Sequence, residues 1–241
     1  MMVDMDNRLK RIVIVGGGTA GWLSAGIIAA EHVVPGNISD PQSQIQVYLI
    51  ESPDIATIGV GEGTWPSMRG TLQKMGVSET DFFRECSASF KQGTQFQGWT
   101  HGAQDSYAHP FTVPHKYSET NLAPHWQAMR DQVKFADAVC PQTQLFASKL
   151  APKQISTPEY AFNVNYGYHL DAGKFADFLH RHCVEKLGVV HISANMTSIN
   201  TAGNGDIDSI STDSKGDIEG DLFIDCTGSR ALLLGEHFNI P

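Results

Sequence analysis

The amino-acid sequence predicts an α/β fold, with a doubly wound sheet and a large inserted segment. Three observations predict this class. A short β-branched run at 11–15 (RIVIV) leads into the glycine-rich run GGGTAG, and good helix formers follow from Trp22 to Glu31. A second apolar run at 45–50 (IQVYLI) ends at an acidic residue. Strand and helix signals alternate again after residue 168, beyond a long stretch where both are weak.

The segment after the second strand is predicted to be an ordered loop followed by two helices. Residues 52–66 are rich in Gly, Pro and Thr, which excludes a helix, and apolar residues alternate with the glycines. Helices are predicted at 67–75 and 78–86, the second with a serine N-cap and an acidic first turn. Residues 89–99 alternate as a strand or hairpin does, and one helix is predicted at about 121–139.

The last part of the chain again reads as regular structure. A helix at 172–187 is followed by a glycine and a strand at 189–193. Two hairpin strands, 197–201 and 207–212, are joined by a Gly/Asn/Asp turn. The last strand, 221–226, meets a Thr-Gly pair. These elements predict that the strands return to the sheet begun at the amino terminus.

The order of these signals predicts two lobes. Residues 1–99 and 168–241 are expected to form one discontinuous nucleotide-binding domain. Residues 100–167, rich in His, Pro and Gln, are expected to be an inserted part of a second lobe.

Composition excludes several classes of function. The chain of 241 residues is 41% apolar, enough for a packed core, and its net charge of −9 argues against binding to nucleic acid or an anionic membrane. No apolar stretch reaches the ~20 residues that span a bilayer, and Met1–Lys10 is too polar for a secretory signal. We therefore expect no membrane partner and a cytoplasmic location.

The cysteines and histidines do not predict a metal site. The four cysteines are far apart, with no CxxC pair, and are expected to be buried thiols. His101, His109, His115 and His125 have spacings that place them on no common helical face. We expect no bound metal.

The first chemical motif is Gly16-x-Gly18-x-x-Gly21, set between a strand and a helix. The first glycine permits a tight turn, the second lets backbone approach a pyrophosphate, and the third allows the helix to pack on the strand. Thr19 and Ala20 lie where the helix begins, so its free N–H groups and dipole favour phosphates there. The motif predicts a dinucleotide site.

Glu51, at the end of the second strand, narrows the choice of dinucleotide. Its carboxylate can accept hydrogen bonds from ribose hydroxyls, which favours FAD or NAD over NADP. In a compact NAD domain the next strand follows after an ordinary crossover, whereas here a long insertion intervenes. A split domain that ends in DLFIDCTG has the layout of the hydroxylase-type FAD fold, so FAD is preferred.

Five runs of the sequence resemble one known family. They are GGGTAGW at 16–22, ESPDIATIGVGEGTWPS at 51–67, SFKQGTQFQGW at 89–99, YHLDAGKFADFL at 168–179 and DLFIDCTGSRALLL at 221–234. Together they resemble the flavin-dependent tryptophan halogenases, whose members share a GGGTAGW start, a TIGVGEAT loop and an FKxGxxFxxW segment. The resemblance is to the amino-terminal portion of that family.

The resemblance implies a reaction and a catalytic residue. In that family FADH2, supplied by a separate flavin reductase, reacts with O2 and a halide ion to give hypohalous acid, which reaches an indole-like substrate. Lys91 matches the catalytic lysine, whose ammonium can hydrogen-bond hypohalous acid or form a haloamine. Read without the flanking match, Lys91 is a surface lysine on a strand edge.

The resemblance also extends the cofactor site. Residues 57–66 match a strap that links the flavin and substrate sites, so Gly59 and Gly61 are expected to let backbone pass close to the flavin. Met196 is expected beside the adenine, and Gly228 closes the strand that returns to the site.

Four further residues have two interpretations each. Glu62 is either an acid or base of the reaction or a carboxylate that caps loop amides. Trp65, Trp99 and Trp126 either stack against an indole or pack in the core.

The sequence departs from the family in extent. A complete member is about twice as long, and the family's WxWxIP motif, second catalytic glutamate and halide-binding Thr-Gly segment have no equivalent here. We therefore expect a partial chain, inactive alone, with exposed apolar surface where the rest would pack. Two other functions stay open: an FAD-dependent monooxygenase or oxidoreductase of the same fold, and a non-catalytic FAD-binding protein.

Overall fold

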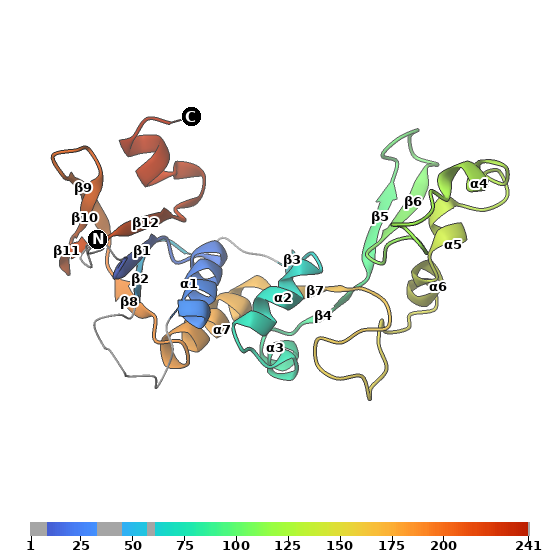
Figure 1. Ribbon diagram of the computed structural model, residues 1–241, viewed down its shortest axis with the longest axis horizontal. Helices are drawn as coiled ribbons and strands as arrows, with labels where there is room; N and C mark the ends of the chain where they lie inside the picture. The colour runs from blue at the N-terminus through green and yellow to red at the C-terminus, as the bar shows by residue number, and fades with distance from the viewer. Residues whose placement is uncertain (1–8, 33–44, 57–60, 241) are drawn as a thin grey trace, which may run out of the picture. The chain divides into compact units, whose positions relative to one another are not determined.

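The computed structural model describes residues 9–32, 45–56 and 61–240 (Figure 1). Within them strands and helices alternate over most of the chain, so the predicted α/β class is confirmed. Residues 57–60, which include Gly59, lie outside the described residues.

The chain divides into two compact units. The first consists of Met1–Val60, Lys74–Val77 and Ala172–Pro241, and the second of Gly61–Gln73 and Ser78–Asp171. The expected boundaries at residues 99 and 168 therefore differ from the observed ones. The physical reason is strand pairing, because the strands at 61–63 and 89–91 hydrogen-bond to the strand at 167–171 and not to the parallel sheet.

A four-stranded parallel sheet forms the centre of the first unit. Its order is β12 (Leu222–Asp225), β1 (Arg11–Val15), β2 (Gln46–Glu51) and β8 (Val190–Ser193). The two middle strands are the most apolar, as expected for strands covered on both faces. All four strands were predicted, with ends that agree within one residue.

Two helices cover one face of this sheet. Helices α1 (Thr19–His32) and α7 (Ala172–Glu185) pack against each other, and α1 packs on β1 and β2. A Cβ at Gly26, in the middle of α1, would overlap the end of the Met75 side chain and crowd the Cys183 sulfur. This glycine, unfavourable for a helix, therefore allows the close approach of neighbouring side chains.

A second sheet covers the other face. Strands β9 (Met196–Thr201), β10 (Ile207–Thr212) and β11 (Gly216–Glu219) are antiparallel, and Ile210 packs against Val13 of β1. A doubly wound sheet has helices on both faces, whereas here an antiparallel sheet covers most of this face, together with Leu233 of the π-helix Leu232–His237, which joins the same apolar cluster. The reason is that β8 passes into β9 within two residues, which leaves no chain for a crossover helix.

The second unit begins with short strands around β7. Strands β3 (Gly61–Gly63) and β4 (Ser89–Lys91) pair antiparallel with opposite edges of β7 (Gly167–Asp171). Helices α2 (Ser67–Lys74) and α3 (Glu79–Glu85) lie between β3 and β4 in the chain. Both helices were predicted, whereas β3 lies in the segment expected to be a loop.

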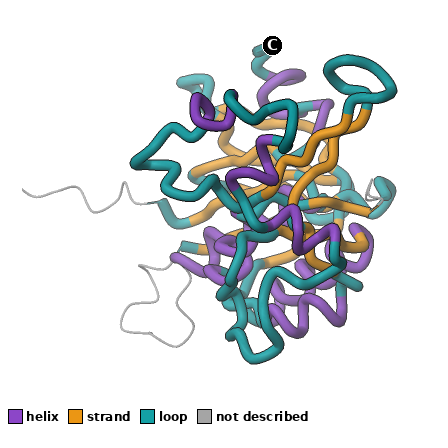
Figure 2. Tube along the Cα trace, turned by 90° about the vertical axis from the view of Figure 1, so that its right-hand side faces the viewer, coloured by secondary structure: helices purple, strands orange, loops and turns teal. Residues whose placement is uncertain are grey.

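The remaining elements of the second unit are short and joined by loops. Figure 2 draws the loops of the whole described chain in teal. Strands β5 (Gly93–Gln97) and β6 (Ser106–Pro110) form a hairpin, so the partner of β5 lies beyond residue 99. Helices α4 (Ala123–Gln127) and α5 (Phe135–Val139) replace the single helix predicted at 121–139.

The break between α4 and α5 has a local cause. Nε1 of Trp126 donates a hydrogen bond to the carbonyl oxygen of Val133, which folds the intervening residues back as turns. Helix α6 (Gln142–Ala147) follows. Among the helices of the described chain, none combines the length and the hydropathy needed to cross a membrane.

Replacement of Ile210 by alanine tests whether β10 covers the parallel sheet. Ile210 is fully buried, so Ile210→Ala should lower the free energy of unfolding by about 2–5 kcal/mol in urea denaturation followed by circular dichroism. The matched control is Ile55→Ala, because Ile55 is 64% exposed and its loss should change the value by less than about 0.5 kcal/mol. Equal effects of the two substitutions would contradict this packing.

Candidate functional site

The loop between β1 and α1 is folded so tightly that two of its glycines have no room for a side chain. Gly16 has a φ of +116°, and a Cβ placed there would overlap the carbonyl oxygen of Cys226. A Cβ at Gly21 would overlap the carbonyl oxygen of Gly16. Both glycines are therefore required by the fold of the loop itself.

Gly18 differs, because nothing in the described chain lies within 4 Å of a Cβ placed on it. It precedes Thr19 and Ala20, which open α1, and Ala20 is exposed. The first amides of a helix have no partner within the helix, and the helix dipole favours an anion there. The open space at Gly18 therefore suits the backbone approach of a phosphate group.

Glu51 ends β2 and lies beside the glycine loop. A Cβ at Gly17 would overlap the Glu51 carboxyl group, so the middle glycine of GGG makes room for this carboxylate. Oε2 of Glu51 lies 2.8 Å from Nε2 of His191 on β8, and both side chains are half-buried. Sequence reasoning missed Gly17 and His191, since neither position belongs to the spacing of the motif.

Asp225, the last residue of β12, anchors the turn that carries Gly228. Its carboxylate accepts hydrogen bonds from the amides of Leu233 and Leu234 and from the amide and hydroxyl of Thr227. Burial opposes ionisation of Asp225, but these hydrogen bonds outweigh it and hold the pKa of the carboxyl below its usual range. Gly228 itself has a φ of +71° and open space beside its Cα.

Two other expected cofactor residues, Met196 and Gly61, have surroundings that do not indicate a particular ligand group. Met196 begins β9, its backbone pairs with Thr212, and its side chain packs on the apolar cluster around Ile210. Gly61 begins β3 opposite Asp171 in the second unit. An adenine contact at Met196 and a flavin contact at Gly61 stay predictions.

Lys91 ends β4 beside two aromatic rings of the second unit. Its Nζ lies 5.6 Å from the ring centroid of Trp65 and 5.4 Å from that of Phe111, and the two centroids are 5.5 Å apart. At these distances an ammonium is attracted to an aromatic face. Nζ also donates a long hydrogen bond, 3.4 Å, to the carbonyl oxygen of Gly63. The structure thus places one of the three candidate tryptophans beside the lysine.

His169 on β7 adds an imidazole to this group. It is opposite Gly63 on one side and Ser89 on the other, which places it near Lys91. Burial, and then the positive charge of Lys91, lower the pKa of His169, so its imidazole is neutral at pH 7. Sequence reasoning missed His169 and Phe111, because only the pairing of β7 and the fold of the inserted segment bring them to the lysine.

Other candidates lie apart from Lys91. Glu62 points to the opposite face of its sheet from Lys91, is exposed, and has no polar partner in the described part of the chain. Because residues 57–60 of the adjoining loop lie outside the described residues, both interpretations of Glu62 stay open. Trp99 contacts Phe96, and Trp126 bonds to its own loop. Over the described ranges, no three His, Cys, Asp or Glu side chains gather as metal ligands.

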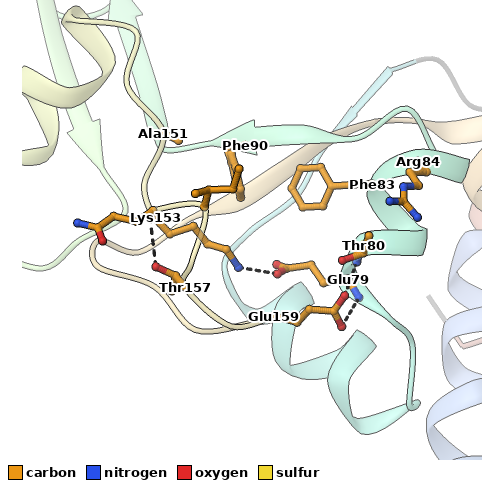
Figure 3. Close-up of a pocket in the computed structure, with 11 residues that line it drawn as sticks. Glu79, Thr80, Phe83, Arg84, Phe90, Ala151, Lys153, Thr157 and Glu159 are labelled. Atoms are coloured by element: carbon orange, nitrogen blue, oxygen red, sulfur yellow. Dashed lines mark hydrogen bonds and ion pairs between the residues drawn. The ribbon is translucent and has the colours of Figure 1, made fainter.

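A buried carboxylate organises the second unit behind β7. Glu79, which is 3% exposed, accepts a hydrogen bond from Nζ of Lys153 at 2.7 Å (Figure 3). It also accepts hydrogen bonds from the hydroxyls of Tyr166 and Tyr168 and from the amide of Tyr160. Burial opposes its ionisation, but these donors outweigh burial and keep the pKa of Glu79 below its usual value. All four donors belong to the fold of the second unit, so we assign the Glu79 carboxylate a structural role.

A cavity of about 450 Å³ lies beside this network (Figure 3). Its apolar wall includes Phe83, Phe90 and Ile155. The second carboxylate at its edge is Glu159. Hydrogen bonds from the side chain and backbone amide of Thr80, and then from the Ser78 hydroxyl and the Glu79 amide, lower the pKa of Glu159 to about 2. Glu79 and Glu159, the two carboxylates at the cavity, therefore both form hydrogen bonds that stabilise the fold.

Comparison with known proteins identifies the family. The sequence model described as tryptophan halogenase matches residues 11–241. The chain belongs to the tryptophan halogenase family. It is 33% identical to tryptophan 6-halogenase ThaL of Streptomyces albogriseolus, over 98% of this chain and 46% of that protein. It is 30% identical to tryptophan 7-halogenase RebH of Lentzea aerocolonigenes, over the same shares of the two chains.

Solved structures of halogenases resemble it as well. The tryptophan halogenase of Shewanella frigidimarina superposes with a TM-score of 0.90 at 51% identity, over 98% of this chain and 46% of that one. Xcc4156, a flavin-dependent halogenase of Xanthomonas campestris, superposes with a TM-score of 0.79 at 35% identity, over 97% and 45%. The chain thus spans about half the length of these halogenases.

Removal of the buried charge at Glu79 tests the network behind β7. Glu79→Gln leaves the ammonium of Lys153 buried without a counter-charge, so the free energy of unfolding should fall by about 3–5 kcal/mol at pH 7. Because the pKa of Glu79 is lowered in the folded chain, its stabilising effect is present at neutral pH. It should be lost as the pH falls below the ordinary value of 4.5 and through the folded pKa.

The free energies of unfolding of the natural chain and of Glu79→Gln are measured by urea denaturation at pH 7 and at pH 4. The matched control is Glu119→Gln, which removes an exposed carboxylate 3.9 Å from Lys116 and should cost less than about 1 kcal/mol. A small effect of Glu79→Gln at pH 7 would rule out this role for the network.

Proposed function

We propose that this chain is the FAD-binding part of a flavin-dependent halogenase that acts on tryptophan or another indole-like arene. The observation that carries the proposal is the ammonium of Lys91 beside the rings of Trp65 and Phe111, in a chain of this family. Aromatic rings beside a cation suit an electron-rich, flat substrate.

The residues of the first unit fit an adenine dinucleotide of the FAD type. The open Cα of Gly18 and the start of α1 would hold the pyrophosphate, and Glu51 would accept hydrogen bonds from ribose hydroxyls. We assign the remaining expected residues to the same cofactor, in the order in which they occur: Gly16, Thr19, Ala20, Gly21, Gly59, Gly61, Met196 and Gly228.

Bound as FADH2 from a separate flavin reductase, the cofactor would supply the two electrons with which O2, a halide ion and a proton give hypohalous acid, water and FAD. Lys91 would then hold the oxidant near the substrate. Its amine either donates a hydrogen bond to hypohalous acid or takes the halogen as N–X with release of water. In both routes halogen replaces one hydrogen of the arene, and the lysine is regenerated.

Replacement of Gly18 by alanine separates cofactor binding from folding. Because the space beside its Cα is open, Gly18→Ala should leave the free energy of unfolding unchanged or raise it by up to about 1 kcal/mol. The new methyl group would obstruct a pyrophosphate, so the affinity for FAD should fall about tenfold or more. Quenching of flavin fluorescence and urea denaturation measure the two quantities.

The contrast variant is Gly21→Ala, whose methyl group would overlap the Gly16 carbonyl and should lower both stability and FAD affinity. Gly70→Ala, at an open position on α2, should weaken neither. If Gly18→Ala binds FAD as tightly as the natural chain, the pyrophosphate does not lie at this loop.

The proposed reaction is tested in a chimera that joins this chain to the carboxyl-terminal part of the Shewanella frigidimarina enzyme beyond the aligned region. With FAD, a flavin reductase, NADH and bromide, the chimera should brominate indole or tryptophan, as detected by mass spectrometry. Lys91→Met should lower the rate by about a hundredfold or more, because it removes the group that directs the oxidant.

Lys74→Met is the control, since Lys74 is exposed and its ion pair with Glu31 lies on the surface. NADH oxidation with peroxide as the sole product would favour an FAD-dependent oxidoreductase or monooxygenase. Failure to bind FAD would contradict every flavin-dependent function for the chain.

A further inference from the structure

We propose that His191 is a positioning residue for Glu51, and that through Glu51 it sets how tightly the chain holds the ribose of an adenine dinucleotide. The inference rests on the proposed function, because it assumes that Glu51 faces a ribose. It assigns a role to a residue outside the glycine motif.

The strand register places the two side chains together. In the parallel pair β2 and β8, His191 lies opposite Leu49, two residues before Glu51. Successive side chains of a strand alternate between faces, so Glu51 and His191 share the face of the sheet that carries α1. They are diagonal neighbours on adjacent strands, close enough for a long side chain to bridge.

Two aromatic rings fix the orientation of the His191 ring. Trp22 on α1 contacts it edge to face with a centroid distance of 5.3 Å, and His180 on α7 does so at 4.7 Å. Trp22 and His180 also contact each other, at 4.8 Å. The imidazole is therefore one of three mutually packed rings, and its Nε2 lies beside the carboxylate of Glu51.

His191 and Glu51 lie close together, but they do not form a well-aligned hydrogen bond. Nε2 of His191 lies 2.8 Å from Oε2 of Glu51, yet it is buried and, within the described chain, has no hydrogen bond of good geometry. A lone pair on Nε2 would repel the carboxylate, so we assign the hydrogen to Nε2. A small rotation of the carboxylate would complete the bond, and a ligand that draws Glu51 into place would supply that rotation.

The carboxylate is confined on its other side by the glycine loop. A Cβ at Gly17 would overlap it, so Glu51 lies between the loop and His191. One oxygen faces the imidazole, which leaves the remaining lone pairs for hydroxyl donors such as a ribose diol. His191 would thereby select one rotamer of Glu51 before the ligand arrives, which lowers the entropic cost of binding.

The imidazole can donate without becoming an ion-pair partner. Burial, and secondarily the neighbouring His180, lower the pKa of His191, against the opposing effect of Glu51. The ring is therefore neutral at pH 7. A neutral donor does not compensate the charge of a carboxylate, so the hydrogen bonds from ribose hydroxyls to Glu51 would be charge-assisted.

The test uses isothermal titration calorimetry of the full chain with ADP and with 2′-deoxy-ADP at pH 7.5. His191→Phe keeps a ring of similar size but removes the donor, so ADP should bind about tenfold more weakly. With 2′-deoxy-ADP the same substitution should cost less than about threefold, because one hydroxyl that Glu51 serves is absent. His191→Gln, which retains an N–H donor, should recover part of the ADP affinity.

His32→Phe is the matched control, because His32 is exposed at the end of α1 and should leave both affinities unchanged. Equal losses for ADP and 2′-deoxy-ADP in His191→Phe would show a merely structural role and overturn the inference. Unchanged ADP affinity in that variant would overturn it as well, while the cofactor site stands. If the natural chain binds neither ADP nor FAD, the proposed function fails first and the inference fails with it.

Discussion

The close contact between the loop after β1 and the end of β12 is the constraint on which the first unit depends. Gly16 lies against the carbonyl of Cys226, and Gly21 against the carbonyl of Gly16, so neither position admits a methyl group. Chain segments more than two hundred residues apart are thereby brought within contact of the first turn of α1. The same approach leaves Gly18 facing open space and brings Glu51 beside Gly17. The close packing of the glycine loop on the end of β12 therefore shapes a site that suits an anionic ligand.

The second unit is built around a charge instead. Glu79 satisfies four donors, two of which are the hydroxyls of Tyr166 and Tyr168 on either side of the start of β7. Strand β7 in turn pairs with β4, where Gly167 lies opposite Lys91. A buried carboxylate that holds β7 in place thus supports the strand that carries the proposed catalytic amine. Such a network gives positional precision at the cost of sensitivity to acid, since it requires Glu79 to stay ionised.

The two units separate the two tasks of the proposed enzyme. The first offers glycine backbone, a helix start and a carboxylate, which suit a dinucleotide, and the second offers an ammonium among aromatic rings, which suits the direction of an oxidant to an arene. The chain spans about half the length of the halogenases to which it is similar. Each unit nevertheless offers features that can be tested in the chain as it stands.

The sequence by itself determined the α/β class, the strands of the parallel sheet, the glycine motif with Glu51, and Lys91 within a family motif. These features are local, because hydrophobic period, glycine spacing and a contiguous motif are all read along the chain. Only the tertiary structure decided that an antiparallel sheet covers the second face, that β4 and β5 take different partners, and that Phe111, His169 and His191 face the candidate sites. Each of these depends on pairing between distant strands, whose register no local pattern specifies.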